Sequence, residues 1–227
     1  MQEPPHGQPP GRQAPKAAVG RVSLYLRQLE AYLDQGLTTI SSSQLGKPLG
    51  ITDAQVRKDL AFFGQFGCPG IGYRADELSE TLRRILGIDR DWPTALVGLG
   101  HLGQALSRYR GFANRRFQIV ALFDNDPSKV GQVYDGLEVR PLDELCTTIA
   151  QRGVLLALLA VPAAAAQDVA EVLAAAGITG ILNFAPRSLV VPARVSVVNV
   201  DLSVQLEHLA YKVQNTGPSG VSSALSS

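Results

Sequence analysis

The residues of this chain with the clearest chemical potential are three glycines, Gly98, Gly100 and Gly103, spaced as G-x-G-x-x-G directly after an apolar run. This order is typical of a strand, a tight turn and the start of a helix. The first glycine allows the turn, the second lets the backbone approach a pyrophosphate, and the third lets the helix pack close to the strand. The first N–H groups of that helix would then face the phosphates. The whole turn is expected to contact the ligand, namely Gly98, Leu99, Gly100, His101, Leu102 and Gly103.

An acidic residue stands where the ribose of a dinucleotide would lie. Residues 118–123 form the next apolar run, and Asp124 follows it. A carboxylate at this strand end accepts hydrogen bonds from the ribose hydroxyls of NAD and repels the 2′-phosphate of NADP. Since no arginine follows immediately, and Asn125 comes next, we expect NAD(H). The alternatives are a turn that binds nothing and a turn that binds another nucleotide, such as coenzyme A.

Groups that could catalyse hydride transfer are scarce near this turn. The histidines are His6, His101 and His208, and none is placed as a clear acid or base. The later strand ends add further expected cofactor contacts: Asn125, Ala160, Val161, Pro162, Asn183, Phe184 and Ala185. They include no strong base or nucleophile, and no cluster has metal-ligand spacing. We therefore expect a cofactor that is sensed rather than consumed, with no catalytic or metal residues, although a base from another subunit is an alternative.

The second half of the chain alternates predicted strands and helices. Apolar strands are expected at residues 94–97, 118–123, 154–160, 180–182 and 195–198, with a minor strand at 137–139. Helices are expected at 103–109, 142–151 and 163–176. Strands without polar alternation are typical of a parallel sheet covered on both faces. The fold class is therefore α/β, with a Rossmann sheet and right-handed crossovers.

The first half of the chain is predicted to be helical and to end in a glycine-rich hairpin. Apolar spacing gives helices from residue 17 to Gly36, at 44–49, at 53–63 and at 76–86. Val56, Leu60 and Phe63 form the expected buried stripe of the third helix, and Asp59 is expected on or beside its outer face. The hairpin at residues 66–73 would be the wing of a winged helix-turn-helix. The alternative is a small helical cap on the nucleotide domain.

Bulk properties set weaker limits. Residues 16–74 carry seven basic and four acidic side chains, a mild excess that fits a DNA-facing surface or an ordinary solvated one. Two cysteines in different predicted domains, no signal peptide and no long apolar run favour a cytoplasmic protein. The expected organisation is a disordered tail at 1–16, a winged-helix domain at 17–90, a Rossmann domain at 91–200, a dimerisation helix at 201–215 and a disordered tail at 216–227. The apolar stripe of that last helix needs a partner, either the sheet domain or a second subunit.

Together these stretches resemble the Rex family of bacterial redox-sensing transcriptional repressors from residue 19 to 214. The resemblance rests on residues 25–27, 55–60, 63–64, 70–73, 97–103, 123–127, 181–186 and 199–202. It implies a homodimer on inverted-repeat operator DNA, with NADH or NAD⁺ as regulatory ligand and C-terminal helices exchanged between subunits. It also implies DNA binding at low NADH and release when NADH rises.

The resemblance assigns roles to individual residues. The expected DNA contacts are Ser43, Thr52, Gln55, Arg57, Lys58, Gly70, Gly72 and Tyr73. Arg27, Tyr109 and Asp201 are expected to form a switch, in which Asp201 of one subunit pairs with Arg27 of the other until NADH brings Tyr109 into competition. The plain alternative is that Asp201 is a helix N-cap and Arg27 a solvated side chain. An NAD-dependent oxidoreductase with a helical cap and a coenzyme A-binding module remain the alternative functions.

Overall fold

The computed structural model describes residues 14–68 and 70–216. The chain folds as two compact units, the first ending at Arg90 and the second beginning at Asp91. Most of each expected tail lies outside the described residues. The first helix begins at Lys16 and the last ends at Thr216, one residue inside each of those tails.

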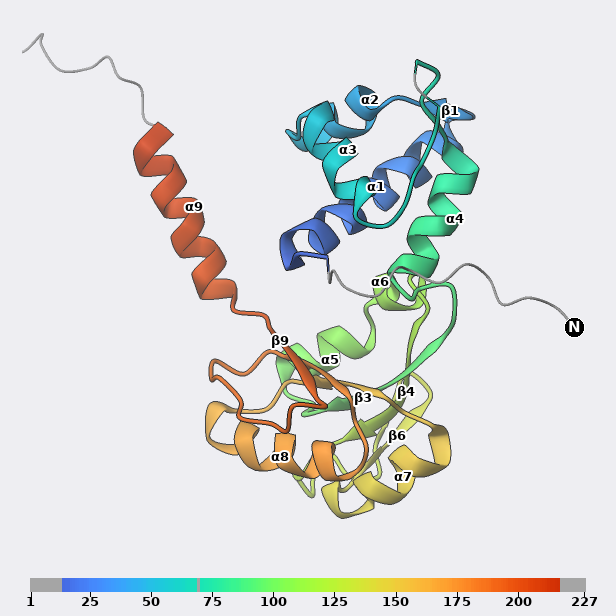
Figure 1. Cartoon of the computed structure of the whole chain (residues 1–227). Coiled ribbons are helices and arrows are strands. Elements are labelled where there is room, and N and C mark those ends of the chain that lie inside the picture. The colour runs from blue at the N-terminus through green and yellow to red at the C-terminus, as the bar shows by residue number, and fades with distance from the viewer. Residues whose placement is uncertain (1–13, 69, 217–227) are drawn as a thin grey trace, which may run out of the picture. The chain divides into compact units, whose positions relative to one another are not determined.

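The first unit is a helical bundle closed by a short pair of strands (Figure 1). Its elements are α1 (Lys16–Asp34), β1 (Thr39–Ile40), α2 (Ser42–Gly46), the 3-10 helix η1 (Lys47–Leu49), α3 (Asp53–Ala61), β2 (Tyr73–Arg74) and α4 (Ala75–Ile85). A capping box starts α2, because Ser41 Oγ accepts from the Gln44 backbone N–H at 3.1 Å and Gln44 Oε1 accepts from the Ser41 N–H at 2.9 Å. Thr52 starts α3 by accepting from the Gln55 N–H at 3.2 Å. The predicted helix-turn-helix is therefore present as α2, η1 and α3.

The glycine-rich segment at residues 66–73 was expected to be a hairpin of its own, but its last residue belongs to a strand that pairs with β1. Cys68 and Gly72 form an isolated antiparallel bridge, which closes the turn. The strand that follows, β2, pairs with β1, with Tyr73 opposite Ile40. Gly72 has φ +102°, and an added Cβ would lie 2.7 Å from the Ile40 carbonyl oxygen, so this position requires glycine.

The second unit is a doubly wound sheet. In chain order its elements are β3 (Trp92–Val97), α5 (His101–Ser107), α6 (Arg110–Ala113), β4 (Phe117–Phe123), β5 (Val133–Tyr134), β6 (Leu137–Arg140), η2 (Leu142–Glu144), α7 (Leu145–Arg152), β7 (Leu156–Leu159), α8 (Ala163–Ala175), β8 (Gly180–Asn183), β9 (Ser196–Asn199) and α9 (Leu202–Thr216). The described strands lie in the order β5-β6-β4-β3-β7-β8-β9, parallel from β6 to β9. From β6 to β9 this is the Rossmann order 3-2-1-4-5-6. The α/β prediction is confirmed.

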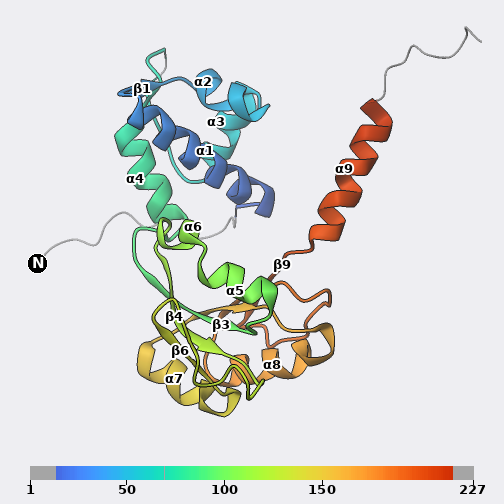
Figure 2. The same ribbon diagram turned by 180° about the vertical axis from the view of Figure 1, so that it is seen from behind.

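Helices cover both faces of this sheet, with α7 and α8 on one and α5 and α6 on the other (Figures 1 and 2). Alternate strand residues supply two cores. Ala95, Val97 and Phe123 pack with α7 and α8, whereas Leu96 and Leu122 pack on the opposite face. Burial on both faces explains why the strand sequences lack polar alternation.

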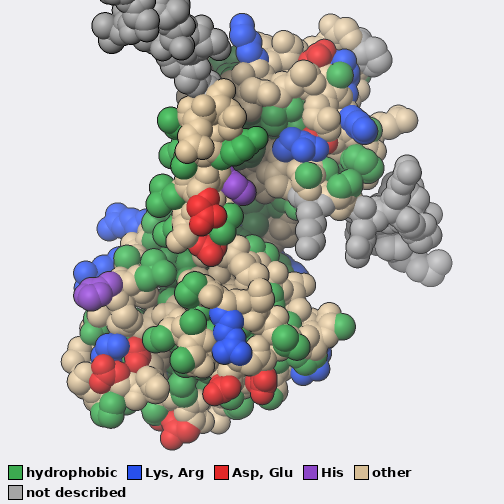
Figure 3. Space-filling view, turned by 90° about the vertical axis from the view of Figure 1, so that its left-hand side faces the viewer, with side chains coloured by type: hydrophobic (Ala, Val, Ile, Leu, Met, Phe, Trp, Pro, Cys, Tyr) green, Lys and Arg blue, Asp and Glu red, His purple; other side chains and the backbone are tan. Residues whose placement is uncertain are grey.

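The last helix, α9, buries none of its described side chains. Large apolar residues lie exposed along it, including Leu202, Leu206, Leu209 and Tyr211. Figure 3 shows the face of the molecule on which this helix lies, with hydrophobic side chains at its surface. Among residues 14–68 and 70–216 of this chain, none covers its apolar stripe. Among the described helices, none combines the length and apolar character needed to cross a bilayer.

Candidate functional site

The second unit has a cleft of about 570 Å³ at the carboxyl ends of its central strands. Val97 ends β3 and lies opposite Leu159 at the end of β7, so the segments that follow these two strands are neighbours. The Rossmann order reverses between these strands, and nucleotides bind at such a reversal point in open α/β sheets. Nine expected cofactor residues line the cleft: Gly98, Gly100, His101, Leu102, Asp124, Asn125, Ala160, Val161 and Pro162.

The glycine turn is held too tightly for any larger residue at two of its three glycines. Gly98 has φ +94°, and an added Cβ would lie 2.5 Å from the Ala160 carbonyl oxygen. A Cβ on Gly103 would overlap the Gly98 carbonyl oxygen. Gly100, by contrast, has open space beside it and lines the cleft. The first and third glycines therefore shape the turn, and the second leaves room for a ligand.

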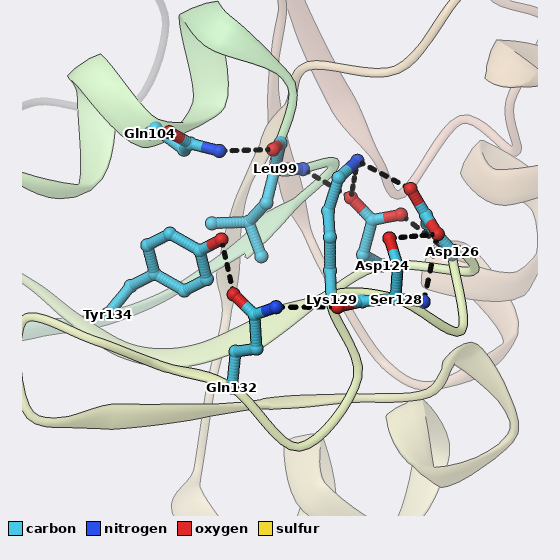
Figure 4. Close-up of polar contacts among 8 residues, drawn as sticks. All are labelled: Leu99, Gln104, Asp124, Asp126, Ser128, Lys129, Gln132 and Tyr134. Atoms are coloured by element: carbon cyan, nitrogen blue, oxygen red, sulfur yellow. Dashed lines mark hydrogen bonds and ion pairs between the residues drawn. The ribbon is translucent and has the colours of Figure 1, made fainter.

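The carboxylate of Asp124 is already engaged by the protein (Figure 4). Its side chain is buried, and Oδ2 accepts from the Leu99 backbone N–H at 2.7 Å and from Lys129 Nζ at 3.2 Å. Oδ1 accepts from the Asp126 N–H at 2.9 Å. Burial alone would raise the pKa of Asp124, but these donors outweigh it and hold the pKa below its usual range. Asp124 thus anchors the glycine turn to the end of β4, and less of it is available to a ribose than we expected.

Lys129 is a cleft residue that the sequence analysis missed. Its ammonium group lies 3.2 Å from Asp124 and 3.4 Å from Asp126, and it lines the cleft. The turn after β4 directs Lys129 toward Asp124. Asp126 stabilises this turn by accepting from both the backbone N–H and the hydroxyl of Ser128. The signal in the sequence was the Asp-Pro-Ser turn that follows Asn125. Because its charge is paired with the two carboxylates, Lys129 does not by itself offer a site for the 2′-phosphate of NADP.

Five expected cofactor residues do not line the cleft. Leu99 and Gly103 are buried in the turn itself. Asn183 is fully buried, and its amide nitrogen donates to the carbonyl oxygens of Ala185 and Arg187 in the loop after β8 and to Asn199 Oδ1 at the end of β9. Its Oδ1 accepts from the Ala185 N–H. Phe184 packs in one core of the sheet domain and Ala185 in the other. The structure therefore places these side chains as a scaffold beneath the loops rather than in the wall of the cleft.

In the first unit, α3 exposes two adjacent cations. Lys58 and Arg57 are both exposed, and Arg57 Nη1 donates to Asp53 at 2.7 Å and to Ser42 at 3.0 Å. The Asp53 pair is exposed at the start of the helix, where it is worth little in stability but holds the guanidinium. Ser43 and Thr52 are also exposed. These residues form an exposed polar set on α2, on the N-cap of α3 and along α3 itself.

One expectation for this unit is wrong, and the structure limits how two of the expected DNA contacts could be made. Asp59 is fully buried rather than on the outer face, because Arg21 and Tyr25 of α1 enclose it. Gln55 donates one of its two amide N–H groups to Asp59 Oδ1 at 2.7 Å, and its contact with DNA stays a prediction. Tyr73 belongs to the core and is 8% exposed, so little of its side chain can contact DNA. Among the other expected contacts in this segment, Gly70 is exposed and Gly72 is half-buried.

Asp59 gives the first unit a predictable acid sensitivity. Burial by itself raises the pKa of Asp59, but hydrogen bonds from Arg21, Tyr25 and Gln55 outweigh it, and the folded pKa lies below the ordinary range. A depressed carboxyl pKa contributes stability that is complete above the unfolded value of about 3.9 and is lost as the pH falls through the folded pKa. We expect the unfolding temperature of the first unit to fall steeply below about pH 4. Asp59→Asn should flatten that acid limb in calorimetry, and an unchanged limb would contradict the assignment.

Known proteins match both units of the chain. A family model described as a putative DNA-binding protein N-terminus matches residues 13–61, and a CoA binding domain model matches residues 89–187. A redox-sensing transcriptional repressor Rex from Carboxydothermus hydrogenoformans is 47% identical over 90% of this chain and 98% of its own length. One from Desulforamulus reducens is 45% identical over 88% of this chain and 95% of its own. The chain belongs to the Rex family.

Solved structures agree with this assignment. The Rex-family repressor RSP in complex with β-NAD⁺ and operator DNA has a TM-score of 0.85 and 35% identity, covering 90% of this chain and 94% of that one. RSP in complex with β-NADH has a TM-score of 0.82 and 34% identity, covering 90% and 96%. The relatives that cover 88–90% of this chain are named transcriptional repressors, so the oxidoreductase alternative falls away. The coenzyme A alternative shares the domain type of the second family model, but these relatives extend across both units.

Within the Rex framework, the three expected switch residues are accessible. Arg27 is exposed on α1. Tyr109 is 59% exposed and meets Phe112 edge to face, with the ring centroids 5.0 Å apart. Asp201 is exposed and caps α9, because its Oδ1 accepts from Ser203 at 2.8 Å and from Val204 at 3.3 Å. The N-cap alternative for Asp201 therefore holds in the single chain, and it leaves the second carboxylate oxygen for another partner.

Proposed function

We propose that this Rex-family protein represses transcription by binding inverted-repeat operator DNA when NADH is low, and that NADH in the cleft beside Gly98 releases it. The observation that carries the proposal is the match across 90% of the chain to RSP, a repressor seen with β-NAD⁺ and operator DNA and with β-NADH. For DNA binding, the first unit offers a helix-turn-helix with exposed Arg57 and Lys58. For NADH binding, the second unit offers the cleft beside the glycine turn. Bacterial DNA and NADH share the cytoplasm, and we propose that compartment.

The lining of the cleft supports a preference for the reduced cofactor. Ala160, Val161 and Pro162 provide an apolar wall where the nicotinamide of a bound dinucleotide would lie. A neutral dihydronicotinamide loses less hydration there than the cationic ring of NAD⁺. Since NAD⁺ is abundant, useful sensing needs a several-hundredfold preference, which corresponds to about 3–4 kcal/mol.

The proposed assembly is a homodimer joined through α9. The exposed stripe of α9 needs an apolar partner, and a hollow of about 420 Å³ on one face of the sheet has an almost wholly apolar lining that includes Phe112, Phe117, Leu158 and Leu182. A second copy of the chain offers both surfaces at once, as a two-fold dimer requires. Such a dimer presents two copies of α3 to the two halves of an inverted repeat.

Mobility-shift titrations test the proposal directly. The probe is an inverted-repeat duplex that the protein itself selects from a random pool, at low salt. We expect a complex that micromolar NADH dissolves and that an equal concentration of NAD⁺ leaves intact. If no duplex is enriched in low salt, or if NADH leaves the complex unchanged, the proposed function is wrong.

Asp201 separates the switch from simple helix capping. Asparagine caps a helix about as well as aspartate, whereas alanine loses a cap worth about 1 kcal/mol. If the charge of Asp201 is traded between Arg27 and Tyr109, then Asp201→Asn and Asp201→Ala should both raise the NADH concentration for half-release at least tenfold or weaken operator binding throughout. If Asp201→Asn is released by the same NADH concentration as the wild type in this titration, then Asp201 serves only as the helix cap of α9.

A further inference from the structure

The helix expected to read DNA is tied to α1 by a buried carboxylate. Asp59 of α3 is 0% exposed, and its two oxygens accept four hydrogen bonds. Arg21 forks across both of them, from Nη2 to Oδ1 at 2.8 Å and from Nε to Oδ2 at 2.5 Å. Tyr25 Oη donates to Oδ2 at 2.7 Å, and Gln55 Nε2 donates to Oδ1 at 2.7 Å. The packing of α1 against α3 does not depend on this charge, because the two helices already share an apolar core.

Asp59 is buried and Arg21 is half-buried, and an ion pair with a buried carboxylate is a poor way to gain stability. Desolvation of the two charges offsets most of their attraction, and apolar residues of similar size often serve as well or better. What such a pair adds is geometry, because a planar guanidinium that meets a carboxylate through two bonds fixes both distance and angle. The Arg21 fork therefore fixes how α3 is rotated about its own axis against α1.

The rotation of α3 decides where its cations point. Arg57 and Lys58 immediately precede Asp59, and successive residues of an α-helix are about 100° apart around the axis. With Asp59 turned fully inward, Lys58 and Arg57 emerge about 100° and 200° away from it, and both are exposed. One N–H of the Gln55 amide is committed to the same carboxylate, so Gln55 adds the fourth hydrogen bond of the tie.

We propose that Asp59, held by Arg21 and Tyr25, is a positioning residue for operator discrimination: it sets the rotation of α3 at which Arg57 and Lys58 meet base edges instead of phosphates alone. The proposal rests on the proposed DNA-binding function. A residue that merely stabilised the unit would alter the fraction folded, and would change binding to every duplex by the same factor. A positioning residue changes the ratio of operator to non-operator affinity in protein that is fully folded.

The test uses two variants of the full chain. Asp59→Asn keeps the shape and removes the charge, and the double variant Arg21→Met with Asp59→Leu replaces the tie with apolar contacts. Dissociation constants are measured for the selected inverted-repeat duplex and for a scrambled duplex of equal length, at one salt concentration. Glu30→Gln is the matched control, because it makes the same change of charge in the 2.9 Å ion pair between Glu30 of α1 and Arg83 of α4, which does not involve α3.

We expect Asp59→Asn to weaken operator binding about tenfold or more, the discrimination that a well-placed base contact supplies, with little loss on scrambled DNA. The double variant should recover the unfolding temperature without recovering the ratio, and Glu30→Gln should keep the wild-type ratio. A wild-type ratio in folded Asp59→Asn or in the double variant overturns the proposal. Should Asp59→Asn not fold, the double variant alone decides. If the wild-type protein itself does not distinguish the two duplexes, the proposed function has failed instead.

Discussion

Replacing Gly103 with alanine is expected to give a repressor that stays on its operator at every physiological NADH concentration. The added Cβ would overlap the carbonyl oxygen of Gly98, which is backbone and cannot swing aside. Relief requires the turn to open, but Gly98 is itself packed against Ala160. The N–H groups that should meet the pyrophosphate would then be displaced. We expect NADH affinity to fall by about 100-fold or more, since several hydrogen bonds to a charged group are lost together.

Fluorescence titration of NADH and the operator mobility shift measure the two consequences separately. Operator affinity without NADH should stay normal, because Gly103 lies in the second unit. Gly100→Ala is the informative comparison. Its Cβ would enter open space, so its unfolding temperature should match that of the wild type while NADH binding weakens. Gly20→Ala is the control on α1, where an added Cβ would have no heavy atom within 4 Å. It should change neither NADH affinity nor operator affinity. Wild-type NADH affinity in Gly103→Ala would show that this turn does not hold the cofactor.

The glycine turn was predictable because its signals are local. An apolar run, three glycines at fixed spacing and an acidic residue at the next strand end lie within one βαβ unit, and short-range sterics determine the turn. What Asp124 does there was less predictable. Its engagement by Leu99 and Lys129 depends on the path of the chain between β4 and β5, which no periodicity reports. For the same reason the sequence could not show that Asn183 turns inward to its own loop.

Asp59 shows the limit of periodicity most clearly. The stripe of Val56, Leu60 and Phe63 defined the buried face of the third helix, and a charged residue beside it is outside by default. The partner that reverses this is Arg21, which lies 38 positions earlier on another helix. The periodicity of a sequence shows which face of a helix is most apolar. It carries no information on a charged residue of another helix that could pair with a buried carboxylate. Two-residue strands such as β1 fall below its reach as well, so the pairing of β2 with β1 was missed.

Ending the chain after Val200 should abolish the dimer and, with it, operator recognition. The truncation removes α9, whose 15 residues expose Leu202, Leu206, Leu209, Tyr211 and Val213 at 55–68%. A helix of this length is marginal in water, so its stability depends on the partner that covers this stripe. We propose that the partner is a second copy of the chain, and the truncated protein should then sediment as a monomer at concentrations where the full chain is a dimer.

Loss of the dimer should cost far more in operator affinity than any single contact. Two half-sites bound by linked units gain from the effective concentration of the second unit once the first is bound, a factor of about 10²–10⁴. A monomer forfeits that factor while its α3 remains intact, so its residual binding should be equally weak on one half-site and on two. A chain ending at Thr216 keeps α9 and serves as the matched control. A truncated protein that still sediments as a dimer would place the subunit contact elsewhere, and the exposed stripe of α9 would then need another occupant.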